Sequence, residues 1–143
     1  MAVVDAMSAA LVTVRPDETV HTAIARMLEN DVGSVAVTDE GRLAGIFTER
    51  DVLRLAGEGS GFGELLVGDV MTRHLFTVEP DDDVLSAARL MQEKRIRHLP
   101  VIQDGNVLGI IGIREVLRTL VERLWSSRDE AARETARDLL RRG

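Results

Sequence analysis

Two polar residues at a helix-capping spacing, Thr48 and Asp51, are the first candidates for chemistry in this sequence. In a Thr-x-x-Asp helix start the two side chains cap free backbone N–H groups, and that role needs no ligand. A carboxylate one turn into a helix can also accept hydrogen bonds from both hydroxyls of a ribose, while the hydroxyl and the helix N-terminus face a phosphate. The pattern therefore fits either a capping box or a nucleotide site.

Three basic residues of the second half of the chain are candidates for the cations that a phosphate requires: Arg97, His98 and Arg114. Guanidinium groups bind phosphate oxygens through two parallel hydrogen bonds. The alternative for Arg97 and His98 is plain solvent exposure at the edge of a strand.

No set of residues supports catalysis. The chain has no cysteine, which excludes disulfides, thiolate nucleophiles and cysteine-based zinc sites. Its histidines have no metal-ligand spacing, and the acidic run 81–83 suits the positive end of a helix dipole. The glycine-rich segment 57–61 has neither phosphate-loop spacing nor a following lysine. We therefore expect no enzyme, no catalytic cofactor and no metal site.

An internal repeat organises the chain, with a register of 64 residues. Residues 12–54 and 76–118 align without a gap, and 16 of these 43 positions are identical. Asp5 and Met7 also return as Asp69 and Met71. The sequence therefore predicts two copies of one structural unit.

Each copy predicts the element order β-α-β-β-α. In the first copy, a β-rich run at 11–14 precedes helical periodicity over 18–30. A hairpin of strands at 34–38 and 43–47 follows, and a second helix starts at Thr48. Because a unit of about 50 residues cannot bury both faces of a three-stranded sheet, we expect the copies to pair about a pseudo-twofold axis. The expected fold class is α/β (α+β), with a C-terminal helix.

The domain boundaries follow from this repeat. Repeat 1 covers residues 1–58, a glycine-rich flexible connector covers 59–68, repeat 2 covers 69–120, and a helical tail covers 121–143. Trp125, the one tryptophan, is expected to pack on the module or on a second subunit rather than on a ligand.

The motif Gly45-Ile46-Phe47-Thr48-Glu49-Arg50-Asp51, the repeated Thr-Val-x-Pro-Asp start and the segment 96–101 together resemble a tandem pair of CBS domains, named after cystathionine β-synthase. The resemblance covers residues 5–120, most of the chain. It implies one disc-shaped module with two clefts for adenosyl ligands such as AMP, ADP, ATP, NAD or S-adenosylmethionine, with AMP or ATP expected first.

The resemblance also implies site residues. Thr48 and Asp51 of repeat 1 would bind phosphate and ribose, together with Arg97, His98 and Arg114 of repeat 2. The base would lie near Ile46, Met71 and Phe76. In the mirror-related cleft, Gly112 and Glu115 replace Thr48 and Asp51, and Gly33-Ser34 replace the basic pair, so that cleft is expected to be weak or empty.

Composition limits the partners. The net charge is −6 and aromatic residues are 3%, which does not favour nucleic-acid binding. No apolar run approaches the roughly 18 residues of a membrane span, and no signal peptide is recognisable, so we expect a cytoplasmic protein. The leading hypothesis is a homodimeric ligand sensor that a partner protein reads. The alternative is a structural homodimerisation module with a vestigial cleft.

Overall fold

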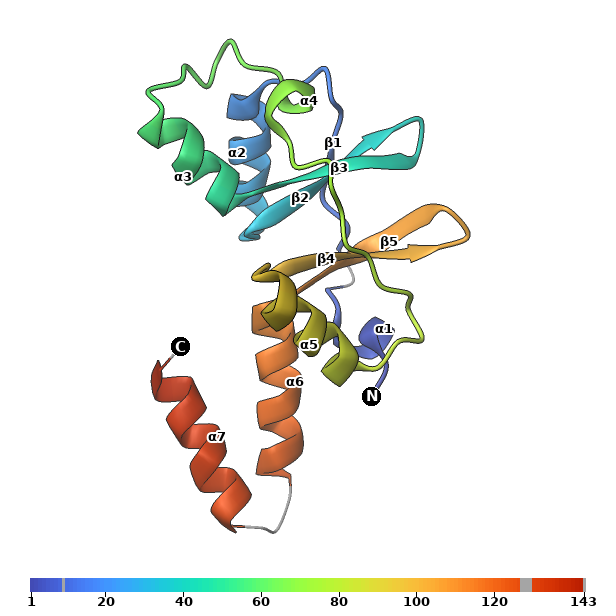
Figure 1. Cartoon of the computed structure of the whole chain (residues 1–143), viewed down its shortest axis with the longest axis vertical. Helices are drawn as coiled ribbons and strands as arrows, with labels where there is room; N and C mark the ends of the chain where they lie inside the picture. The colour runs from blue at the N-terminus through green and yellow to red at the C-terminus, as the bar shows by residue number, and fades with distance from the viewer. Residues whose placement is uncertain (9, 127–129, 143) are drawn as a thin grey trace.

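The computed structural model describes residues 1–8, 10–126 and 130–142. A five-stranded sheet runs through the middle of the molecule, in the order β1-β2-β3-β5-β4 (Figure 1). Its strands are β1 (Thr13–Val14), β2 (Ser34–Asp39), β3 (Arg42–Thr48), β4 (His98–Gln103) and β5 (Asn106–Gly112). The helices are α1 (Val3–Ala6), α2 (Val20–Asn30), α3 (Glu49–Gly57), α4 (Val67–Val70), α5 (Val84–Lys94), α6 (Ile113–Trp125) and α7 (Glu130–Arg142).

The two repeats meet at the centre of this sheet. Within each repeat, two strands form an antiparallel hairpin, and the hairpins touch where Arg42 of β3 pairs with Asn106 of β5. The short β1 lies parallel to β2, and its counterpart in repeat 2 is a single parallel bridge between Val78 and Val101. This arrangement confirms the predicted fold class of two pseudo-twofold-related units.

Both hairpins turn through the same backbone conformation. Glu40 and Gly41 have φ values of 49° and 80°, and Asp104 and Gly105 have 52° and 80°. Two consecutive residues with positive φ define a type I′ turn, whose twist matches that of antiparallel strands, and an acidic residue followed by glycine suits it. The turns that the sequence predicts at these positions are thus present.

The first long helix of each repeat begins at a side-chain cap. Thr19 accepts a hydrogen bond from the Thr22 amide at 3.2 Å, and Asp83 accepts one from the Leu85 amide at 2.8 Å. Helix α2 therefore starts at Val20, two residues after the predicted start at 18. The cap lies at Thr19 because its hydroxyl reaches the free amides of the first turn.

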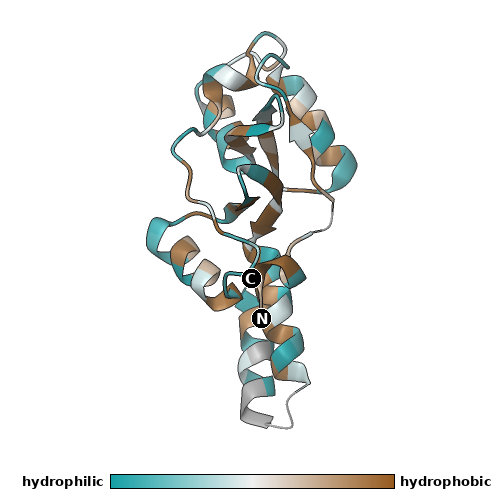
Figure 2. Cartoon of the chain, turned by 90° about the vertical axis from the view of Figure 1, so that its right-hand side faces the viewer, coloured by the Kyte–Doolittle hydropathy of each residue, from teal (hydrophilic) through white to brown (hydrophobic). Residues whose placement is uncertain are grey.

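Two apolar cores fill the space between the sheet and the helices, and Figure 2 shows the apolar colouring concentrated on the central strands. Each core includes a short segment that, by the 64-residue register, belongs to the other repeat. Val67 and Met71 pack into the core of repeat 1, whereas Val3 packs into the core of repeat 2. The two repeats therefore exchange short segments.

Backbone hydrogen bonds fix this exchange. The Val67 amide donates to the Glu18 carbonyl at 2.8 Å, so α4 docks beside the start of α2. On the other side, the Val3 amide donates to the Asp82 carbonyl at 2.8 Å, so α1 docks beside the start of α5. The repeated Asp-x-Met motif thus marks two equivalent docking segments.

The C-terminal tail is helical, as predicted. Helix α6 runs past residue 120, the predicted end of repeat 2, to Trp125, and α7 packs back along it (Figure 1). The Trp125 ring is 46% exposed and lies 5.1 Å from the Arg137 guanidinium of α7.

Candidate functional site

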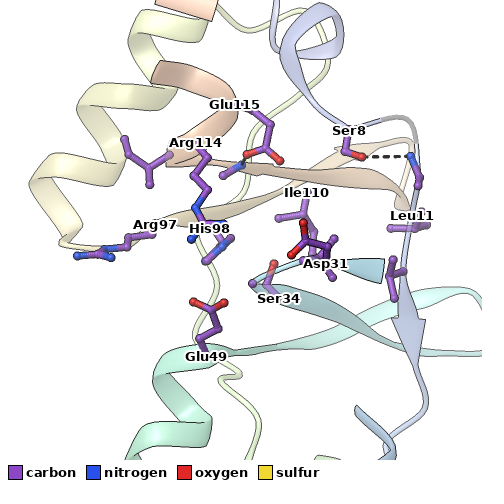
Figure 3. Close-up of a pocket in the computed structure, with 16 residues that line it drawn as sticks. Ser8, Leu11, Asp31, Ser34, Glu49, Arg97, His98, Ile110, Arg114 and Glu115 are labelled. Atoms are coloured by element: carbon purple, nitrogen blue, oxygen red, sulfur yellow. Dashed lines mark hydrogen bonds between the residues drawn. The ribbon is translucent and has the colours of Figure 1, made fainter. Parts of the chain in front are cut away.

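A pocket of about 130 Å³ lies between the two repeats (Figure 3). We call it the interface pocket. One wall comes from repeat 2, at the start of β4 and at the β5–α6 junction. The other wall comes from repeat 1, at the segment before β1, the α2–β2 junction and the first residue of α3. Its polar and charged lining residues are Ser8, Asp31, Ser34, Glu49, Arg97, His98, Arg114 and Glu115.

The three predicted cations all line the interface pocket. Arg97 and His98 stand at the start of β4, and Arg114 is the second residue of α6. The Ile113 amide donates to the Arg97 carbonyl at 2.8 Å, which holds the α6 N-terminus beside β4. Among the described residues, none forms a hydrogen bond or an ion pair with these three side chains.

Two arginines of repeat 1 are engaged in short ion pairs. Arg26 donates to both oxygens of Glu18 at 2.7 Å, and Arg15 donates to Asp17 at 2.8 Å. The contrast matters because a guanidinium has five N–H donors to satisfy. In the interface pocket, the donors of Arg97 and Arg114 are available to a ligand.

Glu115 supplies one of the carboxylate acceptors of the interface pocket. It is the third residue of α6, and its Oε2 accepts a hydrogen bond from the Gly112 amide at 3.0 Å. This is half of a capping box, because Gly112 has no hydroxyl to return the bond. An ionised carboxylate offers about four acceptor positions, so most of the capacity of Glu115 remains for a ligand.

The structure places Thr48 and Asp51 away from the interface pocket. The Asp51 side chain is buried, with the residue 7% exposed, and its Oδ2 accepts from the Thr48 amide at 3.0 Å. The Thr72 hydroxyl donates to Oδ1 at 3.3 Å, and the Arg54 guanidinium lies 3.6 Å from the same oxygen. Thr48 and Asp51 therefore form the capping box that their spacing allows. The binding of a ligand by these two residues stays a prediction.

The apolar residues predicted to contact the base also lie outside the interface pocket. Ile46 is buried in β3 and Met71 in the core of repeat 1. Phe76 packs against the core of repeat 2, with the His74 ring edge-on at 5.4 Å and the Lys94 ammonium 5.0 Å from its centroid. Ile110, which holds the position of Ile46 in repeat 2, lines the pocket instead.

The exchanged segments explain why the two sides differ. The backbone of Thr72 pairs with Ile46 through hydrogen bonds of 2.9 and 3.0 Å, which holds this segment against β3. A Cβ on Gly45 would lie 2.8 Å from the Thr72 carbonyl, whereas one on the equivalent Gly109 would lie 3.4 Å from the Ser8 carbonyl. The segment that contains Thr72 thus lies closer to its strand, and it brings a hydroxyl to Asp51.

His98 and Glu49 meet over Gly33 at the centre of the module. The position that a Gly33 Cβ would take lies 3.2 Å from His98 Nε2 and 3.3 Å from Glu49 Oε1. Burial lowers the pKa of the His98 imidazole, Glu115 and Glu49 oppose this shift, and Arg114 and Arg97 add to it. At neutral pH the imidazole is therefore mainly uncharged.

This shift predicts a pH dependence of stability. Because the pKa of His98 is lower in the folded state than its ordinary value of about 6.5, the unfolded chain binds this proton more readily. The free energy of unfolding should therefore fall as pH drops through about 6.5 toward the folded pKa. Urea denaturation between pH 7.5 and 5.5 gives the free energy of unfolding at each pH. This free energy should depend less steeply on pH in His98→Gln than in the unsubstituted chain. Equal slopes would contradict this prediction.

Within the ranges that the structure describes, no helix is both long enough and apolar enough to cross a lipid bilayer.

Comparisons with known proteins agree with the repeat and with the fold. The family described as "CBS domain" matches residues 3–58 and again 67–122. The mitochondrial protein CBSX3 of Arabidopsis thaliana is 42% identical over 111 residues, which cover 73% of this chain and 54% of that protein. The chain thus spans about half the length of this relative.

Solved structures give the same picture. The CBS-domain containing protein ATU1752 from Agrobacterium tumefaciens superimposes with a TM-score of 0.77 and 31% identity, over 83% of this chain and 98% of that one. The CBS domain pair of protein MJ0100, in complex with 5-methylthioadenosine and S-adenosyl-L-methionine, gives a TM-score of 0.79 at 23% identity, over 86% and 98% of the two chains. With both copies of the repeat matched by the family, the chain belongs to the CBS-domain proteins and carries two CBS domains in tandem.

Proposed function

We propose that this chain is a regulatory module that binds an adenosyl compound in the interface pocket and transmits its presence to a partner protein. One observation carries the proposal. The interface pocket gathers Arg97, Arg114 and Glu115 with donors and acceptors that the described residues leave available. Unused charged groups that converge on a cleft are typical of a binding site.

The ligand's polar end would contact repeat 2. The Glu115 carboxylate would accept the ribose hydroxyls, and Arg97 and Arg114 would bind the substituent on the 5′ carbon. The N-terminus of α6 adds favourable backbone dipoles for an anionic group at this position.

The base would contact repeat 1. The segment that precedes β1 brings Leu11 and Val12 to the pocket, and Val32 adds further apolar surface, which Ile110 of repeat 2 completes from the opposite wall. Adenine suits such a mixture because its faces are apolar and its edge bonds to backbone groups. The adenosyl compounds bound to MJ0100 belong to this class, and AMP and ATP are members with an anionic 5′ group.

Assembly and location form part of the proposal. Leu28 on α2 is 77% exposed and Leu53 on α3 is 75% exposed, which leaves apolar surface for a second copy in a homodimer. We place the module in the cytoplasm. The alternative, a homodimerisation module with a vestigial cleft, does not explain why charged groups of the pocket remain unpaired by the described residues.

An adenosyl ligand should raise the melting temperature. A ligand at 100 times its Kd contributes about 2.7 kcal/mol to the free energy of unfolding, or roughly 5–10 °C for a chain of this size. Thermal unfolding should be measured with AMP, ADP, ATP, NAD, S-adenosylmethionine and methylthioadenosine.

Calorimetry should then give one ligand per chain, because Thr48 and Thr72 already occupy the acceptors of Asp51. The absence of a shift with every compound at millimolar concentration would favour the structural alternative. Two equal sites per chain would contradict the assignment to one pocket.

A further inference from the structure

Glu49 enters the interface pocket from the repeat opposite to the cations. It is the first residue of α3, and its amide donates to the Gly33 carbonyl at 3.0 Å. Figure 3 shows its carboxylate directed across the pocket toward His98, with the end of the Arg114 side chain next to that imidazole. Gly33 leaves room for this approach, because a Cβ there would lie 3.3 Å from Glu49 Oε1.

The pocket is not a simple basic site. Its lining side chains carry three carboxylates and two guanidinium groups: Asp31, Glu49, Glu115, Arg97 and Arg114. His98 adds no full positive charge at neutral pH, since burial lowers its pKa. The described residues offer the Glu49 carboxylate no ion pair, so its negative charge remains unneutralised inside the pocket.

Two guanidinium groups match one phosphate. Each can donate two parallel hydrogen bonds to phosphate oxygens, and together they balance the charge of a single dianion. A ligand whose ribose bonds to Glu115 would have its 5′ substituent within reach of Arg114, which lines the same pocket. A second and third phosphate would extend across the pocket and meet Glu49.

From this geometry we infer that Glu49 is a specificity-determining residue, which restricts the interface pocket to adenosyl ligands with at most one phosphate. The ligand class is a nucleoside monophosphate rather than a triphosphate. This inference rests on the proposed function, because it assumes that an adenosyl ligand occupies the pocket.

The test compares AMP and ATP by titration calorimetry in magnesium-free buffer of fixed ionic strength. The unsubstituted chain should bind AMP about tenfold or more tightly than ATP, since like charges at contact distance disfavour the longer ligand. Glu49→Gln should raise the ATP affinity by about tenfold and change the AMP affinity by less than about threefold. Because Glu49 is exposed, the variant should keep its fold, which its melting temperature checks.

Glu64→Gln is the matched control, because it removes the same charge from an exposed connector residue outside the pocket. It should leave the ratio of the two affinities unchanged. Equal affinities of the unsubstituted chain for AMP and ATP would overturn the inference, and so would equal gains for both ligands in Glu49→Gln. If neither nucleotide nor any other adenosyl compound binds, the proposed function fails as well, so the two failures are distinguishable.

Discussion

Replacing Glu115 with glutamine should lower the affinity for an adenosyl ligand by about tenfold to a hundredfold. The amide keeps the size of the side chain, but it removes a charged acceptor for ribose hydroxyls, and hydrogen bonds to charged groups contribute about 1.5–3 kcal/mol each. The fold should be little affected, because Glu115 has a single hydrogen bond, from the Gly112 amide, among the described residues. Titration calorimetry with the ligand that gives the largest thermal shift measures this effect.

Asp51→Asn is the matched change in repeat 1, and it should act on stability instead. Asp51 is buried and accepts from Thr48 and Thr72, so the substitution should cost about 1–3 kcal/mol of unfolding free energy. The affinity of the folded protein should stay nearly constant. If Asp51→Asn abolishes binding and Glu115→Gln does not, the ligand occupies the cleft that sequence analysis favoured.

Gly45→Ala should destabilise the protein by about 1–3 kcal/mol, the usual cost of overpacking. Its Cβ would lie 2.6 Å from the Met71 sulfur and 2.8 Å from the Thr72 carbonyl, distances that real Cβ atoms do not show. The segment at Thr72 would have to move away from β3, with loss of its two hydrogen bonds to Ile46. Urea denaturation gives the change in the free energy of unfolding.

Gly109→Ala is the control for this experiment, since Gly109 holds the equivalent position in repeat 2. A Cβ there would lie 3.3 Å from the Met7 sulfur and 3.4 Å from the Ser8 carbonyl, a tight contact that small shifts relieve. Its cost should be below about 1 kcal/mol, because less backbone has to move. If both variants lose the same free energy of unfolding, the segment at Thr72 does not lie closer to its strand than the segment at Ser8 does, and the prediction is wrong.

The hairpins and helices could be predicted from the sequence because each depends on a short run of neighbouring residues. Short β-rich runs on both sides of a glycine-containing turn predict both hairpins, and the structure adds that Glu40-Gly41 and Asp104-Gly105 turn with positive φ. The 64-residue register predicts the pairing of two equal units, since neither buries its sheet alone. The predicted start of α2, residue 18, precedes the observed start by two residues. Several residues before Val20 can cap a helix, and only the geometry selects Thr19.

The grouping of the site residues could not be read from the sequence. The spacing of Thr48 and Asp51 is the same in a ligand site and in a capping box, and the structure shows the box. Glu115 has the same spacing to Gly112, but Gly112 lacks the hydroxyl of Thr48, and for that reason the sequence predicts a weak or empty cleft there. Which of the two carboxylates is buried depends on how closely a distant segment approaches, and no local pattern records that distance.

The exchange of α1 and α4 between the two cores has a consequence for how the two clefts can differ. A single 64-residue copy would carry a docking segment that fits another copy's core, and two identical copies would complete each other as a symmetric dimer. In such a dimer every substitution appears in both clefts at once. Two copies within one chain are free of that constraint, and here Gly33 and Arg97, like Asp51 and Glu115, differ at equivalent positions. A covalent link between the copies therefore permits two different clefts on one pseudo-symmetric scaffold, which two identical chains cannot have.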